Sequence, residues 1–347
     1  MINFRNIENN TFKFSNDVNY IYGQNGSGKT NIIEAIYYLS CAKSFRGVRD
    51  SDIIMKTKEH FFLEGKVVNK NKTSKIEIGN NTKNKNIYIN KKQIRKNADL
   101  FGIFYPVIFS PQDIFIVQGA PSVRRRCVDR LIASLEENYI KILKDYNYAI
   151  DERNKLLRDM PDSEENVYAA FEEVLVKNGL KISEFRMKYI DIINSFISPI
   201  YKHLADNVDA LNVFYKSSFD MESQVNLKSK YKDLRNRDIL LKRTTLGPHL
   251  DDVEIFLNNE KAKYFASTGE QKTIGIAIRL AEARVYDSIN NEVPVLLLDD
   301  IFSELDESRR KHLINSFFNK GQILITSPDK CQVKGDVNYI KMENLDA

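Results

Sequence analysis

The 347-residue sequence has little of what secreted, membrane-spanning or zinc-binding proteins need. Its three cysteines, Cys41, Cys127 and Cys331, lie far apart and form no CxxC pair, so neither a zinc site nor a disulfide framework is expected. The four histidines are scattered, which argues against a histidine metal cluster. No run of 18 apolar residues predicts a membrane span, and the N-terminal segment "MINFRNIENN" lacks the apolar core of a secretion signal. We therefore expect a cytoplasmic protein with reduced thiols and no membrane partner.

Charge is nearly balanced over the whole chain but not locally. The net charge is +5, whereas residues 66–97 contain ten Lys/Arg residues and one acid, Glu77. This basic stripe, as we call residues 66–97, could neutralise a nucleic-acid backbone, and Lys91, Lys92 and Arg95 are its candidate DNA-binding residues. The alternative is a solvated pair of strands in a chain that is rich in Lys and Asn throughout.

Strand and helix patterns divide the chain into an N-terminal strand region and a helical region. Beyond Pro121, apolar residues recur at spacings of three and four residues. This pattern predicts one helix of about thirty-five residues that is capped by Ser122 and ends before Pro161. A second helical pattern spans residues 167–200, with an interruption at Gly179 and a kink near Pro199. Apolar residues with a period near two predict strands in NTFKFS (10–15), NYIYG (19–23), FFLEGKVV (61–68), SKIEIG (74–79) and NIYIN (86–90).

Strand character returns after the helices. The expected elements are strands in LNVFYKSSF (211–219) and DVEIFLNNEKAKYFA (252–266) with a hairpin turn at Asn258-Asn259, a helix over 268–289, an apolar strand VPVLLLD (293–299), a further helix, and a strand QILITS (322–327). Apolar strands bordered by helices are typical of a sheet covered on both faces. We predict an α/β fold, with a mixed sheet and helices on both faces. Residues 1–118 and 241–347 form its nucleotide-binding lobe I, and residues 119–240 form an inserted helical lobe II or short antiparallel arm.

One glycine-rich segment predicts a phosphate-binding loop. Gly23-Gln24-Asn25-Gly26-Ser27-Gly28-Lys29-Thr30 fits the pattern G-x4-G-K-[ST] and lies between a predicted strand and a predicted helix. Glycines let successive N–H groups converge on an anion, and the helix adds the positive end of its dipole. Lys29 can reach the β- and γ-phosphates of ATP, and the Thr30 hydroxyl can bind Mg²⁺. A chance match in a surface turn would not be flanked in this way.

Two adjacent acids end the apolar strand VPVLLLD. Asp299 and Asp300 lie at its C-terminal end, where open α/β sheets bind ligands. In the P-loop template Asp299 would hold Mg²⁺ or its water, and Asp300 is the candidate catalytic base that orients the attacking water, acting with Lys29. The alternative is an ordinary acidic turn, which the preceding P-loop makes the less favoured interpretation.

The segment FASTGEQKTIGIAIRLA (265–281) predicts a helix whose N-terminus is both capped and accessible. Ser267 and Glu270 have the spacing of a capping box. A cap alone does not explain Gly269 in the first turn, where glycine costs about 1 kcal/mol relative to alanine. Glycine there lets another surface approach, and a capped helix N-terminus is itself an anion site.

Together these motifs resemble those of the ATP-binding-cassette ATPases. Ser267-Thr268-Gly269-Glu270-Gln271 is similar to their signature motif, which closes on the γ-phosphate held by a second subunit. Ser303-Glu304-Leu305-Asp306 resembles their D-loop, and Gln112 in FSPQDI resembles the Q-loop glutamine. Thr326 stands where many relatives have a switch histidine. The resemblance implies nucleotide contacts by Ser267, Gly269, Gln271 and Asp306, and a Mg²⁺ site made of Thr30, Asp299 and Gln112.

Within this class the chain is similar to the RecF family of bacterial recombination mediators. The segments that carry the resemblance keep their order along nearly the whole chain: NGSGKTNIIEAIYYLSCAKSFR (25–46), GAPSVRRRCVDRLI (119–132), DERNKLL (151–157) and RTTLGPHLDD (243–252). One departure is Glu270, where the family usually has glutamine. A carboxylate there would lie near the anion site unless the capping box holds it away.

The resemblance implies a function in recombinational repair, replication restart and the SOS response. Two chains would dock head to tail around two ATP molecules and clamp double-stranded DNA near gaps or single-/double-strand junctions. With RecO and RecR the nucleoid-associated dimer would promote RecA loading, and slow hydrolysis by Asp300 would release it. Arg124 and Arg125 would join the basic stripe in binding DNA, although an arginine of this run could instead pair with Asp129.

Three other classes remain as alternatives. A transporter's nucleotide-binding subunit would need a groove for a membrane partner, and an SMC-like head would need a far longer coiled-coil insertion. A P-loop kinase for a small molecule would not need the signature-like and D-loop-like segments.

Overall fold

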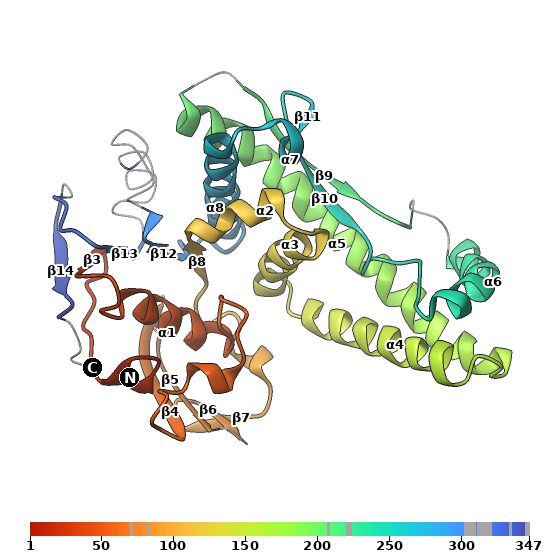
Figure 1. Ribbon diagram of the computed structural model, residues 1–347, viewed down its shortest axis with the longest axis horizontal. Coiled ribbons are helices and arrows are strands. Elements are labelled where there is room, and N and C mark those ends of the chain that lie inside the picture. Colours follow the sequence, from red (N-terminus) through yellow and green to blue (C-terminus); the bar gives the residue numbers. More distant parts are fainter. Residues whose placement is uncertain are drawn as a thin grey trace. The chain divides into compact units, whose positions relative to one another are not determined.

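The computed structural model describes residues 1–69, 72–81, 84–206, 209–219, 224–301, 310, 321–332 and 335–343. The chain forms two compact units, whose elements are labelled in Figure 1. Unit 1 consists of Met1–Asp113, His203–Ala205 and Arg279–Ala347, and unit 2 consists of Ile114–Lys202 and Asp206–Ile278. In this described part, no helix has both the length and the apolar character that a bilayer crossing requires.

A five-stranded sheet at the centre of unit 1 is parallel throughout. Most side chains of its three central strands are buried, as expected for a parallel sheet covered on both faces. All five strands end at the same edge, so the loops that follow them gather there. In spatial order the strands are β14 (Val337–Lys341), β3 (Val18–Tyr22), β13 (Ile323–Ser327), β12 (Val295–Asp299) and β8 (Pro106–Phe109).

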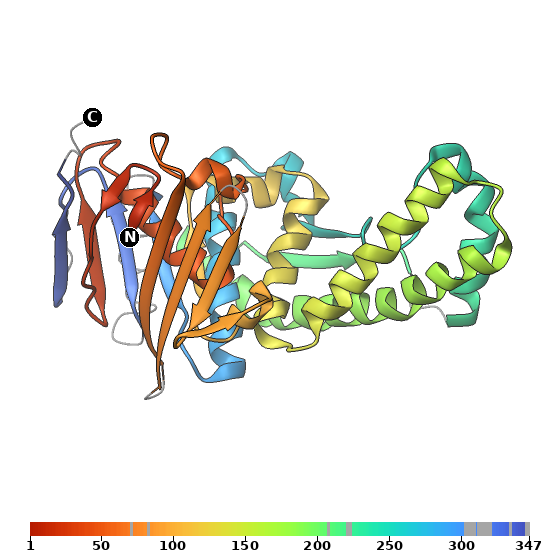
Figure 2. The ribbon, with the colours of Figure 1, turned by 90° about the horizontal axis from the view of Figure 1, so that it is seen from below.

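A second, antiparallel sheet of unit 1 lies on the other side of helix α1 (Lys29–Cys41) (Figure 2). Ile32 and Ile33 pack in a cluster with the parallel sheet, whereas Tyr38 and Leu39 pack with the antiparallel one. The predicted mixed sheet is therefore two sheets that share one helix. The second sheet has the order β2 (Ile7–Asn9), β1 (Ile2–Phe4), β4 (His60–Asn69), β5 (Lys72–Asn81), β6 (Lys85–Ile89) and β7 (Lys92–Ile94).

The strand predicted for residues 10–15 does not form. The segment has no strand pairing, and Phe12 and Phe14 stack on each other with ring centroids 6.4 Å apart. Both rings pack against the cluster around α1 and the parallel sheet. Alternating burial was thus present, but a loop that packs on the core produces the same alternation as a strand.

Unit 2 is mostly helical, with one small antiparallel sheet. Helices α4 and α5 run in opposite directions, and α6 lies at the end where they meet (Figures 1 and 2). The helices are α2 (Ile114–Gln118), α3 (Pro121–Leu135), α4 (Tyr139–Asp159), α5 (Glu165–Ala205), α6 (Gln224–Leu241), α7 (Ala262–Phe265) and α8 (Thr268–Asn290), the last of which continues into unit 1. The sheet has the order β11 (Glu260–Lys261), β10 (Asp252–Leu257) and β9 (Leu211–Lys216).

The first long helix predicted for this region is two helices, α3 and α4. The apolar spacing continues across the break at residues 136–138, which is why periodicity did not reveal it. The Glu136 carboxylate accepts hydrogen bonds from Tyr189 (2.9 Å) and Lys188 (2.8 Å) of α5. The N-cap of α3 is Ala120, and Pro121 occupies the first helical position, so the predicted Ser122 cap is wrong.

Further local predictions concern the continuity of helix α5 and the hairpin turn at Asn258-Asn259. Helix α5 runs for 41 residues without interruption, past both Gly179 and Pro199. A Cβ on Gly179 would lie 2.6 Å from Cε2 of Phe219, so this glycine makes room for a ring rather than ending a helix. The hairpin turn at Asn258-Asn259 is confirmed, since both residues have positive φ (50° and 69°) between β10 and β11. Helix α6 and strand β14 were not predicted.

The boundaries of the two units differ from those of the predicted lobes. They fall after Asp113 and after Ile278, rather than at 118/119 and 240/241. Strand β10 pairs with β9 over six residue pairs and contacts α3, so the segment that follows α6 packs with the helical unit. Periodicity along the chain carries no information about this pairing.

Candidate nucleotide-binding site

The predicted P-loop has the geometry of an anion site. Gly28 is the N-cap of α1 with φ 96°, and Gly26 has φ 89°. Residues other than glycine rarely adopt these backbone conformations. The Lys29 ammonium is almost wholly buried and donates to the carbonyl oxygens of Gly23 (2.8 Å) and Gln24 (3.0 Å). The loop and the first turn of α1 thus present a cation and a helix N-terminus together.

Two residues outside the motif brace this loop. Asn6 donates its amide to the Gly26 carbonyl oxygen (2.8 Å) and accepts from the Asn31 amide (2.7 Å). A Cβ on Gly28 would lie 2.8 Å from Asn6 Oδ1, and a Cβ on Gly23 would lie 2.4 Å from the Met342 carbonyl oxygen. These glycines are therefore required by close neighbours as well as by the turn. Nothing in the sequence pattern had marked Asn6 or Met342.

Thr30 and Asp299 meet at the edge where the parallel strands end. The Asp299 carboxylate accepts from the Thr326 hydroxyl (2.9 Å), with which it is aligned across β12 and β13. Burial raises the pKa of Asp299 above its ordinary value, and the neighbouring Asp300 charge adds to this effect. Hydrogen bonds from Thr30 and Thr326 act in the opposite direction. A divalent cation at this point would stabilise the charged carboxylate that burial disfavours.

Thr326 holds both acids of the pair. Its hydroxyl donates to Asp299 and accepts from the Asp300 backbone N–H (3.0 Å). Asp300 has φ 51°, a conformation that aspartate tolerates better than most residues. Thr326 is fully buried. The resemblance associated this position with a switch histidine, whereas here the residue positions the two acids.

Gln112 is exposed on the turn Pro111–Asp113 that follows β8. Because β8 pairs with β12 in parallel, with Phe109 opposite Leu298, this turn leaves the sheet at the same edge as Asp299. Strand order therefore brings the three predicted Mg²⁺ ligands, Thr30, Asp299 and Gln112, to one edge.

The residues present fit a nucleotide with Mg²⁺. The Ser27 hydroxyl is buried in the loop and has no hydrogen-bond partner among the described residues, so the loop retains a polar group for a ligand. The described residues also contain no cluster of three or more potential ligands from His, Cys, Asp and Glu. Magnesium is commonly bound by one or two carboxylates together with substrate phosphates, and Asp299 supplies such a carboxylate. ATP would supply the phosphates.

A buried carboxylate on α1 supports this edge, and the sequence analysis missed it. Glu34 accepts two hydrogen bonds from the Arg5 guanidinium (2.9 and 2.7 Å) and one from Ser44 (2.5 Å). Arg46 lies 3.7 Å from the same carboxylate, and its charge partly opposes the rise in the pKa of Asp299 that burial causes. Ser44 and Arg46, at the end of the segment NGSGKTNIIEAIYYLSCAKSFR, therefore both meet Glu34.

The signature-like segment in unit 2 is exposed and capped. The Ser267 N–H donates to the Glu270 carboxylate (2.7 Å) and the Glu270 N–H donates to the Ser267 hydroxyl (3.3 Å), which confirms the capping box. The Glu270 carboxylate is thus held at the cap. A Cβ on Gly269 would have no described heavy atom within 4 Å, so the helix start is open to another surface.

Gln271 does not belong to that open surface, and its role as a nucleotide contact stays a prediction. Its side chain is buried, donates to the Ala266 carbonyl oxygen (2.9 Å) and accepts from Gln118 (2.6 Å). Its amide therefore fixes the turn before α8. The D-loop-like residue Asp306 lies outside the described residues.

Arg124 and Arg125 both have partners inside unit 2, and their role as DNA contacts stays a prediction. Arg124 is buried and makes two hydrogen bonds to Asp252 (2.8 and 2.9 Å). Arg125 donates to the Asp251 carbonyl oxygen (2.6 Å), and burial lowers the pKa of its guanidinium. Asp129 pairs with Arg186 of α5 (2.8 Å).

The basic stripe is partly neutralised by acids from neighbouring strands and turns. Lys75 pairs with Glu64 and Glu77, and Lys85 pairs with Asp50. Lys91, Lys92 and Arg95 are exposed at and after the β6–β7 turn, where Lys91 has φ 67°. The predicted DNA-binding residues of the stripe are therefore accessible.

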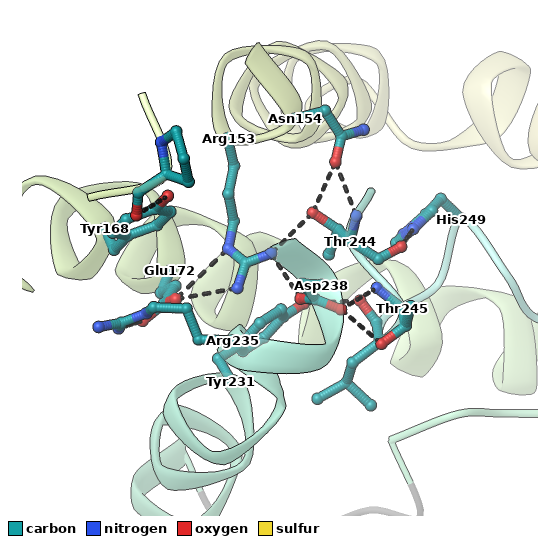
Figure 3. A network of polar contacts seen from close by, with 12 residues as sticks. Arg153, Asn154, Tyr168, Glu172, Tyr231, Arg235, Asp238, Thr244, Thr245 and His249 are labelled. Carbon is teal, nitrogen blue, oxygen red and sulfur yellow. Dashed lines mark hydrogen bonds and ion pairs between the residues drawn. The ribbon is translucent and has the colours of Figure 1, made fainter. Parts of the chain in front are cut away.

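A buried polar network joins α4, α5 and α6 (Figure 3). Arg153 is wholly inaccessible and donates to Glu172 (3.1 and 3.3 Å), Asp238 (2.7 Å) and Thr244 (3.0 Å). Arg153 belongs to the segment DERNKLL and Thr244 to RTTLGPHLDD, whereas Glu172 and Asp238 lie outside both segments. These two motifs of the resemblance thus build the helical unit rather than the nucleotide site.

His249 at the edge of this network makes the stability of unit 2 sensitive to acid. Its Nδ1 accepts from the Tyr146 hydroxyl (2.7 Å), which leaves Nε2 to donate to the Thr244 carbonyl oxygen (3.2 Å). Burial lowers the pKa of His249 below its ordinary value. The unfolded chain therefore binds the proton more readily, so stability is full above about pH 6.5 and falls below it by at most about 1.4 kcal/mol per pH unit. We expect chemical denaturation between pH 7.5 and 5.5 to show this loss in the wild type and a smaller slope in His249→Gln.

Comparisons with known proteins show which family the chain is similar to. A family model described as "RecF/RecN/SMC N terminal domain" matches residues 1–346. A protein of Bacillus cereus (strain G9842), "DNA replication and repair protein RecF", is 32% identical over 335 residues, which cover 94% of this chain and 89% of that protein. A protein of the same description from Bacillus thuringiensis (strain Al Hakam) gives the same values.

Solved structures add the fold. The structure described as "the recombination mediator protein RecF-ATP in RecFOR pathway" matches with a TM-score of 0.91 and 31% identity, covering 98% of this chain and 93% of that one. An Smc head bound to the winged-helix domain of ScpA has a TM-score of 0.55 and 16% identity, with 94% and 87% covered, which shows likeness of fold alone. The predicted ATPase-head fold with an inserted helical region is confirmed.

Proposed function

The chain belongs to the RecF family of DNA replication and repair proteins, which are P-loop ATPases, and from this premise we propose that ATP binding switches it into a head-to-tail homodimer that clamps DNA. Lys29, Thr30 and Asp299 of one chain would bind Mg-ATP, and Ser267 and Gly269 of a second chain would cover the γ-phosphate. Hydrolysis would then remove the shared ligand and release the dimer. The proposed setting is cytoplasmic and nucleoid-associated.

One observation carries the proposal: the signature-like helix start is capped, exposed and unobstructed at Gly269. Helix N-termini attract phosphate, and the missing Cβ permits backbone approach. Because ATP held by one chain would also contact the second chain, ATP would bind the dimer more tightly than the monomer, and dimerisation would follow by mass action. Sedimentation with ATP, ADP or no nucleotide, with and without duplex DNA, tests this directly. A strictly monomeric protein with a non-hydrolysable ATP analogue and DNA would contradict the proposal.

Double-stranded DNA at gaps or junctions is the proposed cargo, and RecO and RecR are the proposed partners in loading RecA. Support for DNA comes from the accessible Lys91, Lys92 and Arg95, whose side chains suit phosphate contacts without base readout. Support for the partners comes from family membership alone.

Asp300 is expected to be the base that orients the attacking water. Asp300→Asn keeps the size of the side chain and its Thr326-held backbone but removes the proton acceptor. We expect hydrolysis to fall by about 10²–10⁴-fold, the range of general-base catalysis, while the ATP-bound dimer persists longer. Asp99→Asn, an exposed aspartate on a separate turn, is the matched control. Wild-type turnover in Asp300→Asn would remove Asp300 from the mechanism.

The lysines at the β6–β7 turn are expected to contribute to the salt dependence of DNA binding. Each phosphate contact contributes about 0.9 to the slope of log K against log salt, so Lys91→Gln with Lys92→Gln should lower the slope by about 2. The control double variant, Lys177→Gln with Lys181→Gln, changes two exposed lysines of α5. Binding of a duplex with a single-stranded overhang, titrated from low to high salt with ATP, is the measurement. An unchanged slope would exclude this turn from the DNA surface.

A further inference from the structure

Three exposed aromatic side chains, which we call the aromatic patch, gather in unit 2 on two short helices. Phe115 of α2 is 53% exposed, and Tyr264 and Phe265 of α7 are each 70% exposed. The two helices contact each other (Figure 1). Among the described residues only two other Phe or Tyr side chains are exposed, Tyr148 and Phe214. Most of the exposed aromatic side chains therefore lie in one place.

Buried amide contacts hold both helices to the start of α8. The Gln271 side chain donates to the carbonyl oxygens of Ala262 (3.3 Å) and Ala266 (2.9 Å), in and just after α7. The same side chain accepts from Gln118 of α2 (2.6 Å). The aromatic patch and the signature-like helix start are therefore carried by one framework, in which Phe265 lies two residues before Ser267.

The exposure of these rings points to a binding surface. A single exposed apolar side chain is ordinary, whereas several on one surface mark a place where another molecule docks. Aromatic side chains are enriched at the centres of protein interfaces, where a few of them carry most of the affinity. Residues 263–265 and 267–269 are all exposed. The described part of the chain thus leaves both the patch and the signature-like segment uncovered.

Position and charge favour a second copy of this chain as the partner. Tyr264 and Phe265 precede the segment Ser267–Gly269, which would cover the ATP of a second chain, so the surface that docks there extends to the patch. A nucleic-acid surface would carry several cations. Helices α2 and α7 contain one charged residue between them, Lys263, and this composition suits an apolar protein contact.

We propose that the aromatic patch is part of the dimer interface, where Phe115, Tyr264 and Phe265 lie against the second chain and supply apolar affinity in addition to the nucleotide contacts. This inference rests on the proposed function. ATP decides when the two chains meet, because its phosphates are the shared ligand, and the patch decides how tightly they hold. The patch has no part in binding ATP to the single chain.

The double variant Tyr264→Ala with Phe265→Ala tests the contribution to affinity. Tyr148→Ala is the matched control, because Tyr148 is 65% exposed on α4. Sedimentation with a non-hydrolysable ATP analogue gives the protein concentration at which dimers form. We expect this concentration to rise at least about tenfold in the double variant and to stay unchanged in the control. Because the removed rings are exposed, the midpoint of urea unfolding and the affinity of the monomer for a fluorescent ATP analogue should stay at the wild-type values.

A second measurement reports burial of the patch directly. The chain contains no tryptophan, so Phe265→Trp places a single indole in the patch. We expect its emission to shift to shorter wavelength when the ATP analogue is added at protein concentrations at which dimers form, and to stay unchanged at concentrations far below them. Tyr148→Trp is the control, and its emission should not respond to the analogue at either concentration.

Three results would overturn the proposal while the proposed function stands. They are dimerisation of the alanine double variant at the wild-type concentration, an indole that stays exposed to water in the dimer, and a loss of dimerisation in Tyr148→Ala as large as that in the double variant. An emission shift caused by duplex DNA without nucleotide would assign the patch to DNA and would overturn it as well. If the wild type fails to dimerise with the analogue, the proposed function fails and this inference fails with it.

Discussion

Replacing Arg153 with methionine is expected to cost about 3–5 kcal/mol of the folding free energy of unit 2, as removal of one partner from a buried ion pair usually does. The guanidinium is wholly buried and is shared by the carboxylates of Glu172 and Asp238, both of which are buried. In the variant, Arg235 would still pair with Glu172 (2.9 Å in the wild type), so the largest uncompensated charge would be that of Asp238. The rings of Tyr168 and Tyr231, whose centroids lie 5.9 and 5.4 Å from the guanidinium carbon, would lose the cation as well.

The matched control is Arg126→Met. Arg126 is exposed on α3 and donates only to the Ser122 carbonyl oxygen (3.3 Å) among the contacts that the structure records for it. Urea unfolding followed by far-ultraviolet circular dichroism measures the difference, and ATP binding reports separately on unit 1. A cost below about 1 kcal/mol, the level of a surface ion pair, would mean that the network relaxes without Arg153. We expect Arg153→Met to destabilise the helical unit while the P-loop still binds ATP.

The nucleotide site was predictable because its motif is local. Eight consecutive residues specify the turn, the lysine and the hydroxyl of the P-loop, and the apolar run of β12 specifies where Asp299 and Asp300 emerge. The capping box at Ser267 and Glu270 is local as well, and it is confirmed. Each of these features depends on residues that are close to one another in the sequence, so the sequence alone contains it.

Contacts between distant segments were not predictable in the same way. Arg124 carried the charge of a DNA-binding residue, yet its partner Asp252 lies 128 residues away. Gln271 stands in the signature-like segment, but its side chain is hydrogen-bonded to the Gln118 amide and to carbonyl groups in and just after α7. Periodicity continued across the break between α3 and α4, because both helices bury the same stripe. Burial and pairing are set by tertiary packing, and a single sequence gives charge and spacing only.

Glu34→Gln is expected to damage unit 1 as strongly as the loss of Arg153 damages unit 2. The carboxylate is fully buried and offsets the charges of Arg5 and Arg46. A neutral amide of the same size would leave both guanidiniums with a poorer partner, at a cost of about 3–5 kcal/mol. Arg5 itself has φ 56°, an unfavourable conformation that the two hydrogen bonds to Glu34 hold in place.

The same substitution should weaken nucleotide binding as well as stability. Arg5 adjoins Asn6, whose amide braces the Gly26 carbonyl of the P-loop, so a loosened Arg5 turn releases the brace. We expect ATP affinity to fall by at least about tenfold, the equivalent of 1.4 kcal/mol. Glu8→Gln is the control, because Glu8 pairs with Lys58 at 3.0 Å on the exposed surface, where an ion pair contributes about 0–1 kcal/mol. Equal effects of the two variants on unfolding and ATP binding would show that burial of Glu34 is not what makes it important.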